Sequence, residues 1–280
     1  MSAPVKLSWP ATKSFWEIPV LFEDEHLFAL DKPAGLAVAP DLDNLERPSL
    51  MRLLHDGIAA GKPWASERQL TYLNNAHRLD DEASGVLLLA KNKLAYIALA
   101  DQFSAEKPVR KNLALAWGSP LDKNFEVDAK LSQHPLKPEL MTVDSRTGKK
   151  SHTKFEVLEQ FSDWCLLASS PLTDRKHQIR VHLKFAGLPV VADEIYGGKK
   201  LWLSRLKKDF YLKPGREERP LIGRTALHAE ELSLSHPVTH EAVTIKCEWP
   251  KDLKVAVKYL RQFATGASRG NFQNEDEFQN

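Results

Sequence analysis

The 280-residue chain has little cysteine and no long apolar segment. Its two cysteines, Cys165 and Cys247, lie far apart and form neither a CxxC pair nor a disulfide framework. No apolar run approaches the roughly 20 residues that a membrane helix needs, and Val86–Ala90 suits a short buried strand. The N-terminus has no apolar core followed by a small-residue cleavage site, so we expect no secretory signal. We therefore expect a cytoplasmic protein with no membrane partner.

Several common site signatures are absent as well. The chain contains no GxGxxG, P-loop or GxSxG pattern, so dinucleotide binding, nucleotide triphosphate binding and a serine nucleophile elbow have no support. Its ten histidines include neither HxH nor HExxH spacing. We therefore predict that the protein has no metal site and needs no cofactor.

Positive charge is uneven along the chain, although the formal net charge is only +2. Residues 199–219, KKLWLSRLKKDFYLKPGREER, hold eight Lys or Arg residues against three acids, with Trp202, Phe210 and Tyr211 between them. Basic residues mixed with aromatic ones suit phosphate contacts and base stacking. A solvated amphipathic helix explains the same stretch, and the stretch alone favours that simpler explanation.

The pattern of elements predicts an α+β fold. Strands are expected on both sides of the 23–26 turn, at 86–90 and 112–118, and within 154–172 and 226–250. Helices are expected near 49–61, 93–106 and 174–189. Asn92 is a candidate N-cap for the second helix, whose Leu94, Ile97, Ala98 and Phe103 line one face, the expected core side. The sequence thus predicts a mixed, largely antiparallel sheet with flanking helices in one domain, residues 1–265, followed by a disordered polar tail, residues 266–280.

The stretch NNAHRLDDEASGVLLLAKN, residues 74–92, places three acids directly before the apolar strand. An aspartate acts as a nucleophile or base only where its surroundings keep it ionised and oriented, and a neighbouring arginine does both. Arg78 is the local candidate partner of Asp80, since residues two apart on an extended chain share a side. Arg180, within the apolar stretch IRVHL, is the distant candidate. Periodicity alone favours a partly exposed helix with ordinary charges around Arg180.

Four blocks together resemble the RluA-type pseudouridine synthases, which isomerise uridine in ribosomal and transfer RNA. HRLDDEASGVLLLAKN resembles the family's His-Arg-Leu-Asp-x-x-Thr-Ser-Gly block, and DRKHQIRVHLKFAGLPVVADEIYGG resembles its Arg-Thr-His-Gln-Ile-Arg-Val-His-Leu block with the following Gly-Asp-x-x-Tyr-Gly. LDKPAGLAV and ALHAEELSLSHPVT match two further blocks in the same order. The resemblance covers roughly residues 19–250, and four ordered blocks are hard to attribute to chance.

The resemblance implies the pseudouridine synthase catalytic fold and a set of site residues. Asp80 corresponds to the catalytic aspartate, Arg180 to its ion-pair partner, and Arg78 to the arginine that fills the gap left by the flipped uridine. It places substrate-binding side chains at Arg78, His77, Asn112, Tyr196 and Ile179. For the RNA backbone we expect contacts from Lys199, Lys200, Arg205, Lys207 and Lys208. It further implies an RNA partner, either rRNA or tRNA, a monomer, and a form without the N-terminal S4 domain of many relatives.

Departures from the family pattern raise a second hypothesis. Ala83, Lys176 and Ala192 replace two threonines and a glycine of the blocks, at supporting positions. In VRKNLALAWG, Asn112 stands where the family has an active-site tyrosine, and asparagine offers neither a stacking ring nor a useful base. Either Tyr196 or Tyr72 replaces that ring, or the site is altered. The first hypothesis is therefore an RNA pseudouridine synthase, an isomerase, and the second is an impaired relative that binds and remodels RNA.

Retention of Asp80 and Arg180 favours the first hypothesis, because a pure RNA binder has little use for a buried ion pair, which is not stabilising in itself. An unrelated carboxylate hydrolase is a third reading, but no second acid is placed to act with Asp80.

Overall fold

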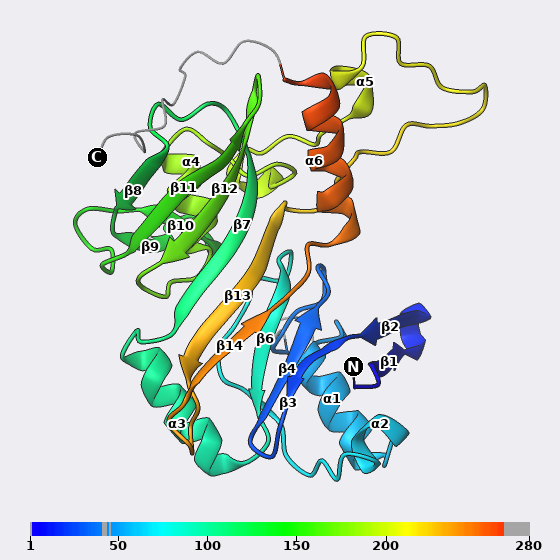
Figure 1. The fold of residues 1–280 in the computed structure, drawn as a ribbon, viewed down its shortest axis with the longest axis vertical. Helices are drawn as coiled ribbons and strands as arrows, with labels where there is room; N and C mark the ends of the chain where they lie inside the picture. The colour runs from blue at the N-terminus through cyan, green and yellow to red at the C-terminus, as the bar shows by residue number, and fades with distance from the viewer. Residues whose placement is uncertain (1, 41–43, 45, 266–280) are drawn as a thin grey trace, which may run out of the picture. The chain divides into compact units, whose positions relative to one another are not determined.

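A computed structural model describes residues 2–40, 44 and 46–265 (Figure 1). The chain divides into two compact units. The first unit takes Met1–Asn112, Ser170–His177 and Leu227–Pro250, and the second takes Leu113–Ser169, Gln178–Ala226 and the chain from Lys251 onward. That residues 1–265 act as one catalytic domain stays a prediction, and the predicted tail at 266–280 lies outside the described residues.

The first unit is built on a sheet whose strands follow the order β3-β4-β6-β13, with β5 against β6 and β14 against β13. The pairs β3–β4, β4–β6, β5–β6 and β13–β14 are antiparallel, whereas β6 and β13 run parallel. The strands are β3 (Val20–Glu23), β4 (Leu27–Lys32), β5 (Asn74–Asn75), β6 (Ser84–Ala90), β13 (Leu227–Ser235) and β14 (Ala242–Lys246). A separate antiparallel hairpin joins β1 (Val5–Trp9) to β2 (Ser14–Ile18) through a 3-10 turn, Pro10–Thr12.

Both faces of this sheet are covered, which explains the continuous apolar run of β6. All seven residues of β6 are buried. Leu87 and Leu89 belong to one apolar cluster, and Val86 and Leu88 belong to another. Because successive side chains of a strand point to opposite faces, β6 separates two cores. One cluster includes residues of α1 (Leu50–Ala59) and α2 (Pro63–Ser66), and the other includes residues of α3 (Lys93–Ser104).

The caps of the helices agree with the sequence, but the buried face of α3 does not. Ser49 accepts the backbone N–H of Arg52 at the start of α1, and Asn92 accepts that of Ala95 at 2.9 Å. The expected core side of α3 is wrong, since Leu94 and Ile97 are 80% and 47% exposed. Ala95 and Leu99 are buried instead. Apolar residues occur around the whole circumference of α3, so the face that contains Leu94 and Ile97 was not the only apolar one.

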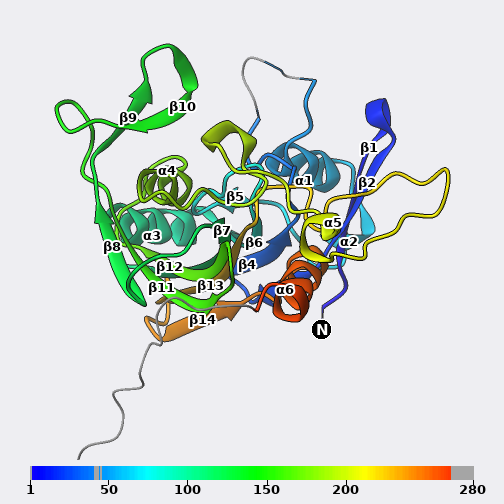
Figure 2. The same ribbon diagram turned by 90° about the horizontal axis from the view of Figure 1, so that it is seen from above.

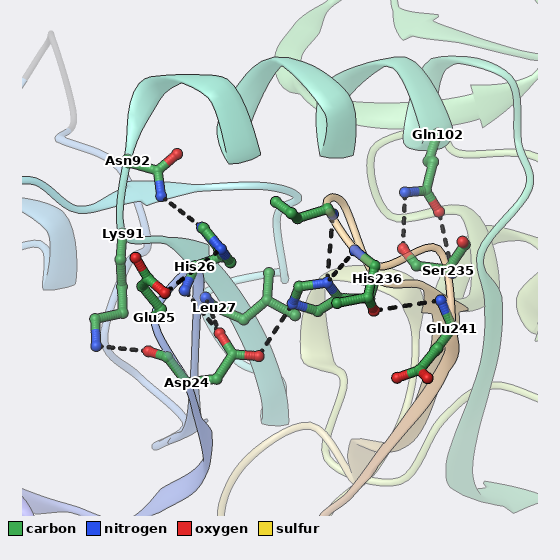
Figure 3. A network of polar contacts seen from close by, with 12 residues as sticks. Asp24, Glu25, His26, Leu27, Lys91, Asn92, Gln102, Ser235, His236 and Glu241 are labelled. Carbon is green, nitrogen blue, oxygen red and sulfur yellow. Dashed lines mark hydrogen bonds and ion pairs between the residues drawn. The ribbon is translucent and has the colours of Figure 1, made fainter.

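A polar network ties the predicted turns of the first unit together (Figure 3). Asp24 caps its own turn by accepting the backbone N–H groups of His26 and Leu27, both at 2.7 Å. Its other carboxylate oxygen lies 3.1 Å from Nε2 of His236, whose Nδ1 accepts two backbone N–H groups of the β13–β14 turn. Gln102 on α3 exchanges two hydrogen bonds with the backbone of Ser235. The side chains of Asp24 and His236 thus satisfy backbone N–H groups of the 23–26 turn and of the β13–β14 turn, and they join the two turns to each other.

The second unit contains strands in the order β7-β12-β11-β8, and a hairpin of β9 and β10. Its strands are β7 (Val109–Trp117), β8 (Asn124–Asp128), β9 (Leu131–His134), β10 (Lys137–Val143), β11 (His152–Gln160) and β12 (Trp164–Pro171). The first residues of β7 and the last of β12 belong to the first unit. The pairs β8–β11 and β9–β10 are antiparallel. The mixed, mostly antiparallel sheet with a few helices confirms the predicted α+β class.

The helices of the second unit are shorter than the sequence suggested. The predicted 174–189 helix is α4 (Gln178–Phe185), and a glycine cap at Gly187 follows it. Gly187 has φ +75°, its N–H donates to Lys184, and the N–H of Leu188 donates to Leu183, which is a Schellman motif. His177, at φ +55°, precedes the helix in a left-handed conformation. A 3-10 turn, Glu194–Tyr196, follows further along.

The basic stretch 199–219 is mostly an extended loop, so an amphipathic helix over its length is wrong. Only α5 (Leu203–Leu206) is helical there, and Pro214 and Gly215 lie in the loop that follows, drawn in yellow in Figures 1 and 2. The sequence analysis placed no element at α6 (Lys251–Phe263), although Leu253, Val257 and Leu260 are buried at helical spacing. No helix of the described residues is long and apolar enough to cross a membrane.

Gly85 provides a test of the parallel β6–β13 contact. A Cβ at this position would lie 2.2 Å from the carbonyl oxygen of Ala229, and the residue has φ +113°. We expect Gly85→Ala to lower the free energy of unfolding by about 3 kcal/mol or more, because the strands must separate. Gly61 also has a positive φ but open space around it, so Gly61→Ala should cost only about 1 kcal/mol. Urea denaturation measures both, and equal losses would contradict the close approach.

Candidate active site

The Asp80 loop, residues 77–83, connects β5 to β6 in the first unit. Asn74 and Asn75 pair with Ala90 and Leu89, so the chain runs antiparallel along β6 before it turns. The turn closes where the N–H of Ala83 donates to the carbonyl of Asp80 at 3.1 Å. The loop therefore presents its side chains at the N-terminal end of a fully buried strand. A side chain at such a position is held by a rigid element while it remains accessible.

Side chains along the loop alternate as the extended chain predicts. Arg78 is exposed, Leu79 packs against the cluster that contains Leu87, and Asp80 is half-buried. Arg78 and Asp80 thus point away from the core side that Leu79 takes. Asp81 lies 3.0 Å from Nη2 of Arg47, with both side chains more than a third exposed. An ion pair this exposed contributes little stability.

The buried ammonium of Lys32 fixes the backbone of the loop. Lys32, the last residue of β4, is 0% exposed. Its Nζ donates to the carbonyl oxygens of Pro33, Leu36 and Asp81, at 3.0, 2.8 and 3.1 Å. The N–H of Gly35 donates to the same Asp81 oxygen at 2.7 Å. An ammonium group has three donors and is costly to bury without partners, so this arrangement ties the Lys32–Leu36 bend to the residue that follows Asp80.

His77 lies in the core beneath the loop as a neutral ring. Its Nε2 accepts the backbone N–H of Leu88 at 3.0 Å, so the ring proton resides on Nδ1. The ring stacks on Phe103 with the centroids 5.0 Å apart. Burial, helped by the nearby Arg110 guanidinium, lowers the pKa of His77 from 6.5 to about 4. The structure gives His77 a packing role, and its predicted contact with substrate stays a prediction.

A hydrogen bond between two buried side chains fixes the start of β6. Ser84 Oγ lies 2.9 Å from Nδ1 of His228, and these residues face each other in the parallel register. Gly85 follows, where the two backbones approach most closely. The family-like block ALHAEEL therefore supports the block HRLDD, since β13 holds the strand that carries the Asp80 loop.

Arg180 occupies the centre of a buried cluster in the second unit. Its guanidinium binds Asp193 in a bidentate pair, Nε to Oδ2 at 2.7 Å and Nη2 to Oδ1 at 2.8 Å. Both side chains are only 1% exposed. The Tyr196 ring lies beside the guanidinium, with Cζ of Arg180 5.1 Å from the ring centroid. The side of α4 that carries Arg180 is thus deeply buried, contrary to the partly exposed helix that periodicity favoured.

Buried polar side chains anchor α4 against β11. Nε2 of Gln178 donates to the carbonyl oxygen of His152 and to Oγ1 of Thr153, both at 3.0 Å. Nδ1 of His182 lies 2.9 Å from the same Oγ1 and Nε2 lies 3.0 Å from the carbonyl oxygen of Ala129. Burial lowers the pKa of His182, so this ring also favours the neutral form. These contacts fix the rotation of α4, and with it the direction of Arg180.

The other predicted site residues fall into three environments. Asn112 and Ile179 are buried, on β7 and α4 respectively. Tyr196 is buried too, and its hydroxyl accepts the backbone N–H of Met141 at 3.0 Å. Most of the predicted RNA-backbone residues are exposed: Lys199, Arg205, Lys207 and Lys208. Lys200 lies 2.8 Å from Glu194 in a partly exposed ion pair. Asp80 and Arg180 belong to different units, so their ion pair stays a prediction.

Sequence reasoning missed two residues that hold the site. Lys32 was part of a quoted block, and its signal was a charged residue at the end of an apolar strand. Asp193 follows Arg180 by thirteen positions in the block that resembles Gly-Asp-x-x-Tyr-Gly, directly after Ala192, where the chain departs from the family pattern. Among the described residues, no group of three or more His, Cys, Asp or Glu side chains is arranged to hold a metal ion.

Comparison with known proteins decides the family. The family model described as RNA pseudouridylate synthase matches residues 26–185, which is more than half of the chain. The chain belongs to the RNA pseudouridylate synthase family. The predicted resemblance is therefore confirmed, and the Asp80 loop lies within the matched range.

Two curated relatives of this synthase family cover most of the chain. Ribosomal large subunit pseudouridine synthase D of Nitrosomonas europaea is 35% identical over 245 residues, which are 87% of this chain and 65% of the relative. Synthase D of Xylella fastidiosa is 36% identical over 246 residues, 88% of this chain and 70% of the relative. The chain thus spans roughly two thirds of the length of these synthases.

A solved synthase structure shares the fold. The structure named Human RNA Pseudouridylate Synthase Domain Containing 4 matches with a TM-score of 0.66 and 26% identity, over 86% of this chain and 92% of that one. The predicted pseudouridine synthase catalytic fold is confirmed.

The buried His77 makes stability depend on pH. Its pKa is lower in the folded than in the unfolded chain, so the unfolded state binds more protons between pH 6.5 and about 4. We expect stability to be fully present above pH 6.5 and to fall by on the order of 3 kcal/mol as the pH drops through this window. His77→Gln should flatten that part of the profile, and the exposed His240→Gln should leave it unchanged. Urea denaturation at a series of pH values measures this, and identical profiles for wild type and His77→Gln would contradict the buried neutral ring.

Proposed function

We propose that this chain isomerises uridine to pseudouridine in RNA, with Asp80 as the catalytic carboxylate. The single observation that supports this best is the Asp80 loop: a half-buried aspartate beside an exposed arginine, on a backbone held by Lys32 within the matched family range. The names of the curated relatives point to the large-subunit ribosomal RNA as the substrate class, and transfer RNA is the alternative target. We further propose a monomer that works in the cytoplasm.

The chemistry suits a single carboxylate. The N1–C1′ glycosidic bond breaks, the uracil turns, and a C5–C1′ bond forms, while C5 loses a proton and N1 gains one. Atoms and electrons balance without an oxidant or reductant, so the isomerisation needs no redox partner. Asp80 begins it either by attack at C1′ or by removal of the C2′ proton, and both routes require the ionised carboxylate.

Access to the glycosidic bond requires the uridine to leave its stack. Flipping costs a few kcal/mol, which contacts in the pocket must offset. Arg78 is exposed two residues from Asp80, a position that suits an arginine entering the gap in the RNA. We propose that Arg180 keeps Asp80 ionised by pairing with it, and that His77, Asn112, Ile179 and Tyr196 shape the substrate site.

The basic stretch 199–219, which contains α5 and the loop after it, supplies the proposed RNA-backbone contacts. Lys199, Arg205, Lys207 and Lys208 are exposed, and exposed cations release counterions when they meet phosphates. Lys200 is the exception within this set because Glu194 already pairs with it. Tyr211, 76% exposed in the same loop, offers a ring for stacking.

The comparisons lend support to an isomerase and none to a relative that only binds RNA. The one observation that favoured the second reading is Asn112, which is 7% exposed on β7. The structure gives Tyr196 a buried place with its hydroxyl engaged by Met141, so we do not assign it the role of the missing ring.

Asp80→Asn tests the proposal directly. We expect RNA from cells that carry this variant to lose pseudouridine at a defined site, and single-turnover conversion by the purified protein to fall on the order of 10³-fold. Chemical mapping by reverse-transcription stops measures the pseudouridine in cellular RNA. Release of the label from C5 of labelled uridine measures the single-turnover conversion.

Asp81→Asn is the matched control, since it makes the same change one residue further along, at an exposed ion pair. It should retain conversion within about twofold. If no site depends on Asp80 while RNA binding persists, the RNA-binding reading replaces this one.

Asn112→Tyr tests the departure from the family. A phenol at this position would supply both a stacking ring and a base for the C5 proton, so we expect single-turnover conversion to rise about tenfold or more. Asn112→Phe supplies the ring alone and separates stacking from proton transfer. If both variants fold and neither converts faster than wild type, the departure does not limit the rate.

A further inference from the structure

We propose that Asp193 is a positioning residue of the reaction: it fixes the plane of the Arg180 guanidinium in the orientation that the catalytic step requires. The inference rests on the proposed function and extends it to a residue outside the quoted catalytic pair. Among the described residues, Arg180 is the largest fully buried side chain.

The bidentate contact between Arg180 and Asp193 fixes the orientation of the guanidinium. Two of the five N–H donors of Arg180, one on Nε and one on Nη2, bind the two carboxylate oxygens of Asp193 at 2.7 and 2.8 Å. A guanidinium is planar, so this double contact fixes the plane and the directions of the remaining donors. The Tyr196 ring beside it restricts rotation out of that plane.

Asp193 itself is held by its backbone. Its N–H donates to the carbonyl of Val190 at 3.1 Å, and its own carbonyl accepts the N–H groups of Tyr196 at 3.1 Å and Gly198 at 2.8 Å. A Cβ at Gly198 would lie 1.8 Å from the Val190 carbonyl oxygen, so this turn closes only around glycine. The Asp193 carboxylate is therefore carried by a rigid turn, and we expect it to move little when RNA binds.

The negative charge of Asp193 allows the Arg180 guanidinium to stay buried. A buried guanidinium without a counterion is strongly disfavoured, and Asp193 supplies a counterion that belongs to the same unit. Arg180 is thereby held buried and oriented before RNA binds, so the cost of ordering it is met during folding. Loss of Asp193 should then affect the chemical step more than RNA affinity.

The experiment compares Asp193→Asn with wild type in single-turnover conversion at saturating RNA. We expect the rate to fall at least 30-fold, while the RNA dissociation constant stays within threefold. Asp252→Asn is the matched control, because Asp252 forms the same bidentate pair with Arg224 in the same unit, at 2.8 and 3.0 Å. It should keep the rate within twofold, and circular dichroism at the assay temperature shows that each variant is folded.

A double-mutant cycle with Arg180→Lys distinguishes orientation of the Arg180 guanidinium by Asp193 from a contribution of Asp193 to the stability of the fold. If Asp193 acts through the guanidinium, Asp193→Asn should cause less than a threefold further loss in the Arg180→Lys background. Asp193→Glu keeps the counterion and changes only its reach, so it tests the same point should Asp193→Asn unfold, and we expect it to lower the rate at least tenfold.

Two results would overturn the inference: full single-turnover rate in folded Asp193→Asn or Asp193→Glu, or independent, multiplicative losses in the cycle. Failure of the proposed function looks different, because wild type and Asp252→Asn would then form no Asp80-dependent pseudouridine at all.

Discussion

The buried ammonium of Lys32 is the contact on which the candidate site most depends. Three carbonyl oxygens surround it, and one of them belongs to Asp81, the residue after the proposed catalytic carboxylate. A hydrophobic residue at this place would leave buried carbonyls without their donor. The charge thus organises a bend of irregular backbone at the end of β4 and couples it to the loop before β6. The backbone next to Asp80 is thus held by the main-chain contacts that Lys32 and Gly35 make with the Asp81 carbonyl.

The second unit also contains a buried cation with its own partners, the guanidinium of Arg180. Arg180 needs a planar partner, and Asp193 matches its fork with two oxygens, whereas Lys32 needs only carbonyls around a point charge. In each unit a buried cation is satisfied by groups of that same unit. Each of these two cations is therefore fixed within its own unit before a substrate arrives, which is the condition under which electrostatic groups contribute most to a reaction.

Much of this fold could be predicted from the sequence, and the limits have physical causes. The β6 strand and the Asn92 cap depend on local patterns, and both were predicted correctly. The buried face of α3 was not predicted correctly. All four of Leu94, Ala95, Ile97 and Leu99 are apolar, and only the tertiary contacts of Ala95 and Leu99 decide that these two are buried. Asp80 and Arg180 came from motifs. Their supports are tertiary partners, which local sequence marks only weakly: Lys32 as a charged residue at the end of an apolar strand, and Asp193 by its place in a family-like block.

The Asn112 departure can now be assigned to one step of the proposed reaction. The contacts that hold the Asp80 loop come from Lys32, Gly35 and His77, and those that hold Arg180 come from Asp193 and the anchors of α4. Replacement of the family tyrosine at position 112 therefore bears on stacking of the base and on removal of the C5 proton, while the cleavage of the glycosidic bond keeps its carboxylate. A chain that had given up catalysis would have no reason to retain the buried Arg180–Asp193 pair, since apolar residues of similar volume would stabilise the same core at least as well.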